Sequence, residues 1–350
     1  MRFVLTFCFL SVILAPSFVL GQFDSGWKAH DLNRPQPQVV KPGDQVGGAP
    51  ADAVVLFDGT DMSMWTDGKG GEAKWKVVDG AMESVPKGGF VYSKEEFGDC
   101  QVHIEFASPA KAKGSGQGRG NSGVFLMGEF EIQVLDSFDN KTYADGGAGS
   151  LYGQYPPLVN VSRPPGQWQT YDIIFRRPRF SEDGQLTTPA KLTVLHNGIL
   201  IQDHSNAYGP TSWIYRKDYK TIKSKTKGVL SLQDHGNPVR YRNIWVRSLA
   251  ESRAQPEQAY PAAAKDFDTQ SASKKLVGKY GSHEIVVVDE NLVLKFNRST
   301  MLEMVPYSPT EFGFVYSAGK VTFQTDESGN VTGMNLNLDA AGSRKLNRSK

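Results

Sequence analysis

Cysteine is almost absent from this chain of 350 residues, which contains only Cys8 and Cys100. Because Cys8 lies in an apolar N-terminal run, a chain that has lost this run keeps one thiol. Neither an intramolecular disulfide nor a Cys-rich metal site is then expected. The chain also has little excess charge, since 39 Lys and Arg face 37 Asp and Glu. The net charge of +2 indicates no polyphosphate partner, so we expect no binding of nucleic acid.

Long hydrophobic runs are missing beyond the N-terminus. Residues 1–21 combine Arg2 with the apolar run FVLTFCFLSVILA, which is the pattern of a secretory signal peptide. Val19 and Gly21 suit the small-residue rule for cleavage, so the mature chain is expected to begin at Gln22. Pro16 and the shortness of the run argue against an uncleaved membrane anchor. We therefore expect a secreted or periplasmic protein with no membrane insertion after signal cleavage.

Glycine and proline are plentiful, with 36 and 19 residues, which favours a turn-rich β protein. Residues 22–50 and 251–274 are polar and rich in Pro, Ala or Gly, and both are predicted to be linkers. Residues 51–250 contain many short alternating runs, which predict an antiparallel β-sandwich. Residues 275–350 contain a smaller set and predict a small β-barrel-like module. Asn197-Gly198 predicts a type I′ hairpin turn.

The strands expected in the larger region are short and follow one another closely. They are Trp75–Val78, Gln101–Phe106, Val124–Leu135, Thr170–Arg176, Leu192–His196, Ile199–Gln202, Gly228–Gln233 and Asn243–Arg247. No amphipathic helix of three turns is indicated.

The sequence EFEIQVLD, residues 129–136, is the densest group of candidate catalytic side chains. In a strand, Glu129, Glu131 and Gln133 share one face, and the apolar residues between them enter the core. A bulge near residue 134 could turn Asp136 to the same side. The spacing resembles the E-x-D-x-x-E strand of laminarinase-type glucanases, but Gln133 replaces the central acid, so ordinary retaining hydrolysis is not expected. A solvated strand face is the structural alternative.

Two further strands carry polar rows that could take part in chemistry. In SLQDHG, His235 shares a face with Ser231 and Gln233, so it could be a base, a ligand or a hydrogen-bond donor to a sugar. A histidine that caps the following turn is the alternative. His103 and Glu105 also share a face, which suits an acid–base pair, a metal pair or a simple surface ion pair.

The loops contribute glycine and aromatic residues. GSGQGRGNSG, residues 114–123, lacks the Gly-Lys-Ser/Thr of a phosphate loop, so a flexible rim with Arg119 and Asn121 as ligand contacts is expected. Loop aromatics suit either sugar stacking or packing. They are Tyr143, Tyr152, Tyr155, Trp168, Trp213 and Tyr215.

A series of motifs between residues 52 and 250 resembles one known family. They are LFDGTDMSMW, WKVVDGAM, EFGDCQVHIEF, GNSGVFL, FEIQVLD, LYGQYPP, PPGQWQTYDIIF, NGILI and LQDHGNPVRYRNIWVR, in that order. Together they resemble the 3-keto-disaccharide hydrolase family, also called domain of unknown function 1080. The resemblance implies a concanavalin-like (lectin/glucanase) β-sandwich and action on sugars whose 3-hydroxyl has been oxidised to a ketone. A second group of motifs is LVGKY, VTFQTDESGNVTGMNL and the terminal Arg344-Lys345. Through them, residues 276–345 resemble the small β module appended to some serine hydrolases and β-lactamase-like proteins.

The resemblance also implies a set of site residues without settling their roles. They are Glu105, Asn121, Glu131, Gln133, Asp136, Tyr152, Gln233, Asp234 and His235. Segments 176–192 and 213–225 are expected to shape the rim of the site.

A 3-ketone acidifies the hydrogen on C2, so the expected reaction is proton abstraction at C2 followed by elimination. Glu131 or His235 is the expected base, with Asp136 and Glu105 as the next carboxylates. Gln133, Gln233, Asn121, Tyr152 and Asp234 are expected to bind the substrate, and Gln133 would hold a hydroxyl or the ketone oxygen. A divalent cation could stabilise the enolate, although no spacing identifies a metal. A non-catalytic, lectin-like carbohydrate-binding module is the alternative.

Overall fold

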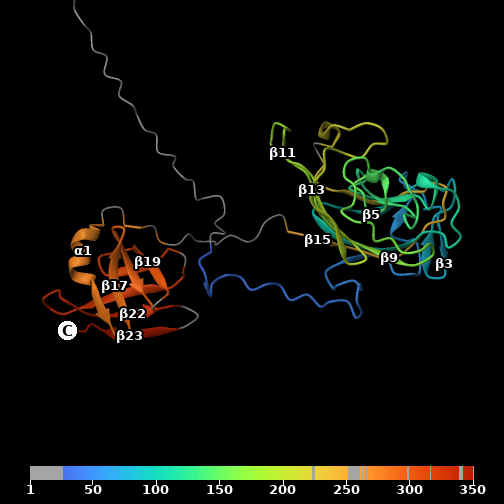
Figure 1. The fold of residues 1–350 in the computed structure, drawn as a ribbon. Coiled ribbons are helices and arrows are strands. Elements are labelled where there is room, and N and C mark those ends of the chain that lie inside the picture. The colour runs from blue at the N-terminus through green and yellow to red at the C-terminus, as the bar shows by residue number, and fades with distance from the viewer. Residues whose placement is uncertain are drawn as a thin grey trace, which may run out of the picture. The chain divides into compact units, whose positions relative to one another are not determined.

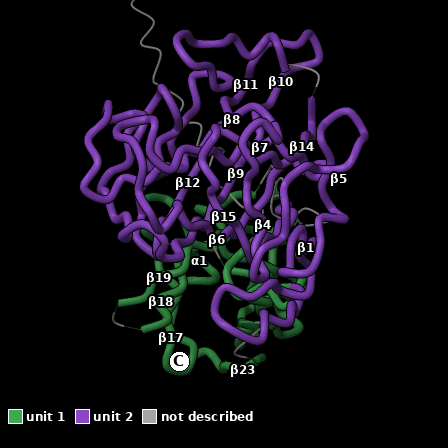
Figure 2. Tube along the Cα trace, turned by 90° about the vertical axis from the view of Figure 1, so that its right-hand side faces the viewer, with its two compact units in different colours: residues 1–37, 252–350 green, residues 38–251 purple. Residues whose placement is uncertain are grey.

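The structure is a computed structural model that describes residues 27–222, 225–250, 261, 263–264, 267–297, 299–315, 317–338 and 342–349. Antiparallel strands make up almost all of its regular structure (Figure 1). The chain forms two compact units, residues 38–251 and a second unit drawn from residues 1–37 and 252–350 (Figure 2). No helix among the described residues could cross a membrane. The predicted signal peptide lies outside the described residues.

Two large antiparallel sheets make up most of the unit of residues 38–251. The larger sheet has the order β13-β12-β9-β6-β15-β4-β3, and β1 also pairs with β15. Its strands are β1 (Val54–Phe57), β3 (Lys76–Val78), β4 (Ala81–Glu83), β6 (Cys100–Ala107), β9 (Gln169–Arg176), β12 (Lys191–His196), β13 (Ile199–Asn206) and β15 (Arg240–Ser248). The smaller sheet has the order β2-β5-β14-β7-β8. Its strands are β2 (Trp65–Thr66), β5 (Val91–Phe97), β7 (Ser122–Leu126), β8 (Phe130–Val134) and β14 (Gly228–Leu232). The predicted β-sandwich is confirmed.

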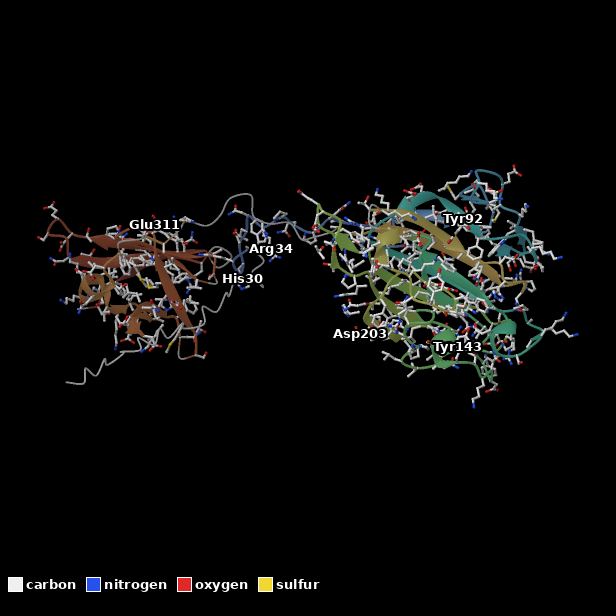
Figure 3. All side chains as sticks on the ribbon, turned by 90° about the horizontal axis from the view of Figure 1, so that it is seen from above. His30, Arg34, Tyr92, Tyr143, Asp203 and Glu311 are labelled. Carbon is white, nitrogen blue, oxygen red and sulfur yellow. The ribbon has the colours of Figure 1, made fainter. Side chains whose placement is uncertain are left out.

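Apolar side chains from both sheets form one core. Alternate residues of β8 (Phe130, Ile132) and of β9 (Tyr171, Ile173, Phe175) are fully buried and belong to the same cluster. Figure 3 draws the described side chains of each unit on its ribbon. Because strand residues alternate between faces, burying this set leaves Glu131 and Gln133 on the opposite face of β8.

Of two hairpins in the sandwich, the sequence pattern predicted one and missed the other. Asn197 and Gly198 both have positive φ, 52° and 78°, and join β12 to β13 as predicted. The predicted strand Val124–Leu135 is instead a hairpin of β7 and β8. Met127 (φ 53°) and Gly128 (φ 68°) form its turn, where the backbone N–H of residue 129 donates to the carbonyl of residue 126 at 3.0 Å. Because the residues on both sides of this turn are apolar, the sequence pattern shows no break between the two strands.

The C-terminal unit is a meander of eight antiparallel strands in sequence order. The strands are β16 (Gly278–Tyr280), β17 (His283–Val288), β18 (Asn291–Lys295), β19 (Met301–Pro306), β20 (Glu311–Phe314), β21 (Lys320–Thr325), β22 (Val331–Asn337) and β23 (Ser343–Asn347). The Ser349 N–H donates to the Lys279 carbonyl at 2.9 Å, which brings the end of the last strand to the first. The predicted barrel-like module is confirmed.

The predicted linker 251–274 overlaps a short helix, α1 (Thr269–Leu276). Asp268 caps it, because its carboxylate accepts from the Ser271 N–H at 3.0 Å. Leu276 is buried in the barrel core. Two turns are too short to show a helical period, so the sequence did not reveal this helix.

Parts of the predicted linker 22–50 are bound to folded structure. Lys28 donates to the Phe314 carbonyl at 2.6 Å and to the Tyr307 hydroxyl at 3.1 Å within the C-terminal unit. In the sandwich, the Gly47 carbonyl accepts from the side chains of Asn243 and Trp245, both at 2.9 Å. These contacts use backbone groups and single side chains, which leave no apolar pattern in the sequence.

Candidate active site

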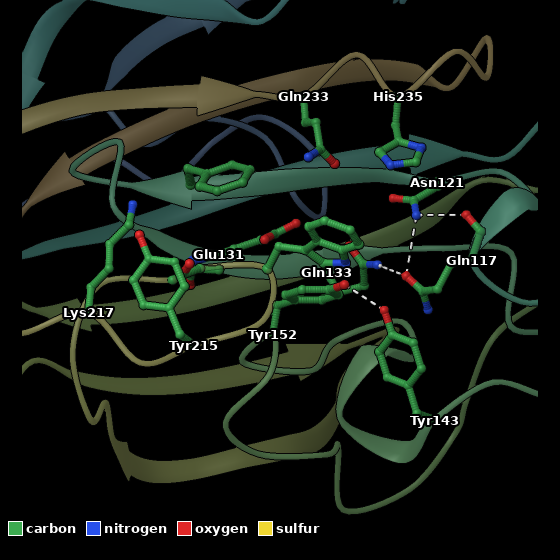
Figure 4. A pocket seen from close by; sticks show the side chains of 14 residues that line it. Gln117, Asn121, Glu131, Gln133, Tyr143, Tyr152, Tyr215, Lys217, Gln233 and His235 are labelled. Carbon is green, nitrogen blue, oxygen red and sulfur yellow. Dashed lines mark hydrogen bonds between the residues drawn. The ribbon is translucent and has the colours of Figure 1, made fainter.

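A pocket of about 740 Å³ lies over the face of the smaller sheet that points away from the core (Figure 4). Its size is that of a small-molecule site. It is lined by Gln117, Asn121, Phe125, Glu131, Gln133, Tyr143, Tyr152, Thr211, Ser212, Trp213, Tyr215, Lys217, Gln233 and His235. The polar row of β8 and the polar row that continues β14 therefore meet in one place. Six of the nine predicted site residues line this pocket: Asn121, Glu131, Gln133, Tyr152, Gln233 and His235.

Glu131 is the only acidic side chain among the lining residues. Glu131 is 5% exposed, and its carboxylate has no hydrogen-bond or ion-pair partner in the described part of the chain. Burial raises the pKa of Glu131 to about 8, because the charged form loses its hydration without gaining a partner. A carboxylate of this kind can take a proton near neutral pH, which is the property that a general base requires.

The amide side chains of the pocket are held by one another. Gln133 Nε2 donates to Gln117 Oε1 at 2.9 Å, and Gln117 Nε2 donates to the Gly146 carbonyl at 2.8 Å. Asn121 Nδ2 donates to the Gln117 carbonyl at 2.8 Å. Gln133 Oε1 and Gln233 Oε1 are buried and have no partner among the described residues. These two oxygens can accept hydrogen bonds from sugar hydroxyls. Gln133 thus suits a hydroxyl better than a ketone oxygen.

Two of the aromatic side chains that line the pocket are exposed to solvent. Trp213 is 79% exposed and Tyr215 is 64% exposed, and both belong to the segment 213–225 that was expected at the rim. Lys217 lies at the same end of the pocket as Tyr215, whereas His235 and Asn121 lie at the other end (Figure 4). The other expected rim segment, 176–192, forms the separate hairpin of β10 (Arg179–Phe180) and β11 (Leu186–Thr188), and none of its residues lines the pocket.

Asp136, predicted as a catalytic candidate, lies outside the pocket lining. It is 2% exposed and binds Arg119 through both carboxylate oxygens, at 2.8 and 3.0 Å. Its carboxylate raises the pKa of Arg119. The pair fastens the glycine-rich loop, which carries Gln117 and Asn121, to the end of β8. Asp136 therefore holds pocket residues in position, and Arg119 serves the loop and is not a lining residue.

Glu105 belongs to β6 in the other sheet and lies outside the pocket lining. It accepts from Arg242 Nε at 2.7 Å and from Asn243 Nδ2 at 2.9 Å. His103 is 4.0 Å from Glu105 but bonds Asp172 at 2.7 Å and stacks on Trp245. These side chains form a polar network on the face of β6 opposite its apolar core residues, and His103 is buried within it, at 3% exposed.

Asp234 is also outside the pocket lining. Its carboxylate oxygens accept from the backbone N–H groups of Gly89 at 3.2 Å and Gly236 at 2.8 Å, so it shapes the turn that carries His235. Sequence reasoning missed Gln117, Phe125, Thr211, Ser212 and Lys217. Two of them had a signal: Gln117 lies in the glycine-rich loop, and Lys217 lies in the segment 213–225 that was expected at the rim.

Donors for a divalent cation are few in the pocket. Among the described residues, no group of three or more His, Cys, Asp and Glu side chains comes together in a way that could hold a metal. Glu131 and His235 are the two such side chains in the pocket lining. The residues present do not fit a protein-bound metal, and the steps proposed below use the chain's own side chains.

Residues 52–247 match the model of the 3-keto-disaccharide hydrolase family, described as a 3-keto-alpha-glucoside-1,2-lyase-like domain. The chain belongs to this family. A solved structure of a candidate glycosyl hydrolase from Parabacteroides distasonis is 45% identical, with a TM-score of 0.59, and the match covers 63% of this chain and 94% of that one. A second candidate glycosyl hydrolase from the same organism is 19% identical, with a TM-score of 0.40, covering 57% of this chain and 94% of that one. No curated protein matches the chain.

Proposed function

We propose that the protein cleaves 3-keto-glycosides by removing the C2 proton, eliminating the anomeric substituent and adding water to the product. The observation that carries this proposal is Glu131, a buried carboxylate on the floor of a sugar-sized pocket, in a chain of this family; none of the residues that the structure describes bonds to it. The 3-ketone makes the C2 hydrogen acidic, because the carbanion formed at C2 is an enolate. A protein base can therefore remove it without a metal-bound hydroxide.

Glu131 is the base in this proposal. Its pKa of about 8 keeps part of it ionised at neutral pH, and burial makes the ionised form a stronger base than an exposed carboxylate. The carboxylate can approach C2 because no group in the described segments occupies its lone pairs. Glu131 later returns the proton to C2 when water has added at C1.

The enolate needs hydrogen-bond donors or a cation close to the former ketone oxygen. The pocket offers the amide of Gln233, the imidazole of His235 and the ammonium group of Lys217. Gln233 is itself placed through Ser122, whose hydroxyl donates to the Gln233 carbonyl at 2.5 Å and accepts from Tyr241 at 2.6 Å. These hydrogen bonds anchor the Gln233 backbone to Tyr241, which is fully buried in the core.

The alternative function is a lectin-like module that binds sugars without turnover. The exposed rings of Trp213 and Tyr215 would serve such a module as well. A binding module has no use, however, for an unpaired carboxylate, whose burial costs stability. The convergence of the two polar rows in one pocket also favours the enzyme, since opposite faces would have favoured simple binding.

The test is turnover of a chromogenic 3-keto-glucoside, with the unoxidised glucoside as the matched negative substrate. Glu131→Gln and His235→Ala should each lower kcat by about 10² or more. Glu129→Gln is the matched control, because Glu129 lies two residues from Glu131 and pairs with Lys225 at 2.7 Å outside the pocket lining. Saturable binding of the 3-keto sugar by a wild-type protein that shows no turnover would establish the lectin-like alternative. Near wild-type turnover in both variants would refute the site assignment.

A further inference from the structure

Two tyrosine hydroxyls in the pocket are joined by a short hydrogen bond. The Tyr143 and Tyr152 oxygens are 2.5 Å apart, and both side chains line the pocket (Figure 4). Tyr152 is partly buried, whereas Tyr143 is 48% exposed. The base assigned above accounts for the proton that leaves C2, but nothing described so far gives a proton to the departing oxygen.

Tyr152 is fixed next to Glu131 by the backbone. The Tyr152 N–H donates to the Glu131 carbonyl at 3.1 Å, and two more backbone bonds hold residues 149 and 150 against Gln133. Residues 149–152 therefore run along the outer edge of β8. Both side chains line the same pocket. Burial and the bond to Tyr143 raise the pKa of Tyr152, and the Glu131 carboxylate adds to this, so the hydroxyl keeps its proton until a leaving oxygen takes it.

The Tyr143 ring lies over Gly146. A Cβ on Gly146 would lie 2.0 Å from the Tyr143 ring, so the ring occupies the space where a side chain at residue 146 would stand. The two tyrosine rings meet edge to face, at 6.2 Å between centroids and 68° between planes. This packing fixes both partners of the hydroxyl pair before a substrate binds.

We propose that Tyr152 is the general acid of the elimination and that Tyr143 supports it by hydrogen bonding to its oxygen. This inference rests on the function proposed above. Glu131 first takes the C2 proton, and the C–H electron pair passes into the enolate. The enolate then re-forms the ketone and makes the C1=C2 bond as the C1–O bond breaks; the C1–O electron pair goes to the leaving oxygen, which takes the Tyr152 hydroxyl proton. The product is a C1=C2 double bond conjugated with the ketone, and Tyr152 is left as a phenolate.

The second half of the reaction restores both groups. Water adds to C1 and gives one proton to the Tyr152 phenolate, while Glu131 returns its proton to C2. Tyr143 donates a hydrogen bond to the phenolate between the two halves. No oxidant, reductant or further reactant is needed besides water.

The experiment compares two 3-keto-glucosides that differ in the leaving group. A 4-nitrophenolate departs without a proton, whereas a methoxide needs one, so an acid matters only for the methyl glycoside. Tyr152→Phe should lower kcat on the methyl glycoside by about 10² or more and on the nitrophenyl glycoside by less than about 10-fold. Tyr143→Phe should show the same selectivity with a smaller loss. Tyr155→Phe, whose ring stacks on Tyr208 outside the pocket lining, is the control and should match wild type.

A second readout separates acid catalysis from a structural role. In D₂O, the C2 hydrogen of the methyl 3-keto-glucoside should still exchange with Tyr152→Phe, because Glu131 remains, but should not exchange with Glu131→Gln. Equal losses on both glycosides, or loss of exchange in Tyr152→Phe, would overturn the role of Tyr152 alone. A wild-type protein that neither exchanges C2 nor cleaves either glycoside would overturn the proposed function together with this inference.

Discussion

The carboxylate of Glu131 lies in the space that a side chain on Gly123 would fill. A Cβ added to Gly123 would be 2.4 Å from Glu131 Oε1 and 2.9 Å from the Phe125 ring. Gly123 pairs with Gln133 in the β7–β8 ladder, and the pair formed by Phe125 and Glu131 lies two positions along on the same face. The glycine therefore lets the carboxylate lie flat on the sheet at the pocket floor.

Replacing Gly123 by alanine should displace the Glu131 carboxylate and lower kcat by about 10-fold to 10²-fold, because a misplacement of about 1 Å can cost that much. The measurement is steady-state turnover of the chromogenic 3-keto-glucoside. Gly118→Ala is the matched control, since a Cβ at that exposed residue meets nothing within 4 Å. Equal activity in the two variants would show that the position of the carboxylate does not matter.

Glu131 should also make stability depend on pH. Its pKa is 4.5 in ordinary surroundings and about 8 in the fold, so the folded state holds a proton that the unfolded chain releases. The free energy of unfolding should therefore fall as pH rises from 4.5 through about 8, by on the order of 3–5 kcal/mol. Glu131→Gln should remove this fall and be more stable than wild type at pH 8 while being inactive.

Denaturant unfolding from pH 5 to pH 9 measures this difference, with Glu129→Gln as the control that should follow wild type. The kcat/KM of wild type should rise over the same range with a midpoint near 8, because the ionised carboxylate is the proposed base. Parallel stability curves for wild type and Glu131→Gln would contradict a buried, unpaired carboxylate.

Strand alternation was sufficient to predict some of the site and insufficient for the rest. It correctly separated Glu131 and Gln133 from the apolar face of β8, and His235 and Gln233 from the leucines of β14. The same alternation holds for Glu105 on β6, yet this residue lies in the other sheet and binds Arg242, 137 positions further along the chain. Alternation tells which residues share a face, but it does not tell which face is covered by distant segments. The fold was easier to predict from the sequence than the site, because short strands and turns depend on residues that are close together in the chain.

Asp136→Asn should destabilise the protein and weaken substrate binding more than it lowers kcat. Removing the carboxylate leaves Arg119, whose side chain is 15% exposed, without its charged partner, at a cost of roughly 3 kcal/mol. The loop with Gln117 and Asn121 should then loosen, which raises KM. The control is Asp44→Asn, because the Lys41–Asp44 pair is exposed and should contribute less than about 1 kcal/mol. A loss of kcat with unchanged KM and stability would instead point to a direct catalytic role.

The last prediction concerns the segment Trp27–Pro37, which belongs to the C-terminal unit although it precedes the sandwich. Lys28 binds the Phe314 carbonyl and the Tyr307 hydroxyl, and the Ala29 carbonyl accepts from the Ala318 N–H at 3.2 Å. All the pocket residues, by contrast, lie within residues 38–251. A chain of residues 38–251 should therefore keep the kcat of the full chain.

A chain of residues 252–350 should fold less stably than it does when a peptide of residues 22–37 is added, because a ligand of the folded state stabilises it by mass action. Thermal unfolding with and without the peptide measures this, and a peptide with Lys28→Met is the control that should stabilise less. No effect of either peptide would show that the segment is not part of this unit, and loss of turnover in a folded 38–251 chain would show that the pocket needs the C-terminal unit.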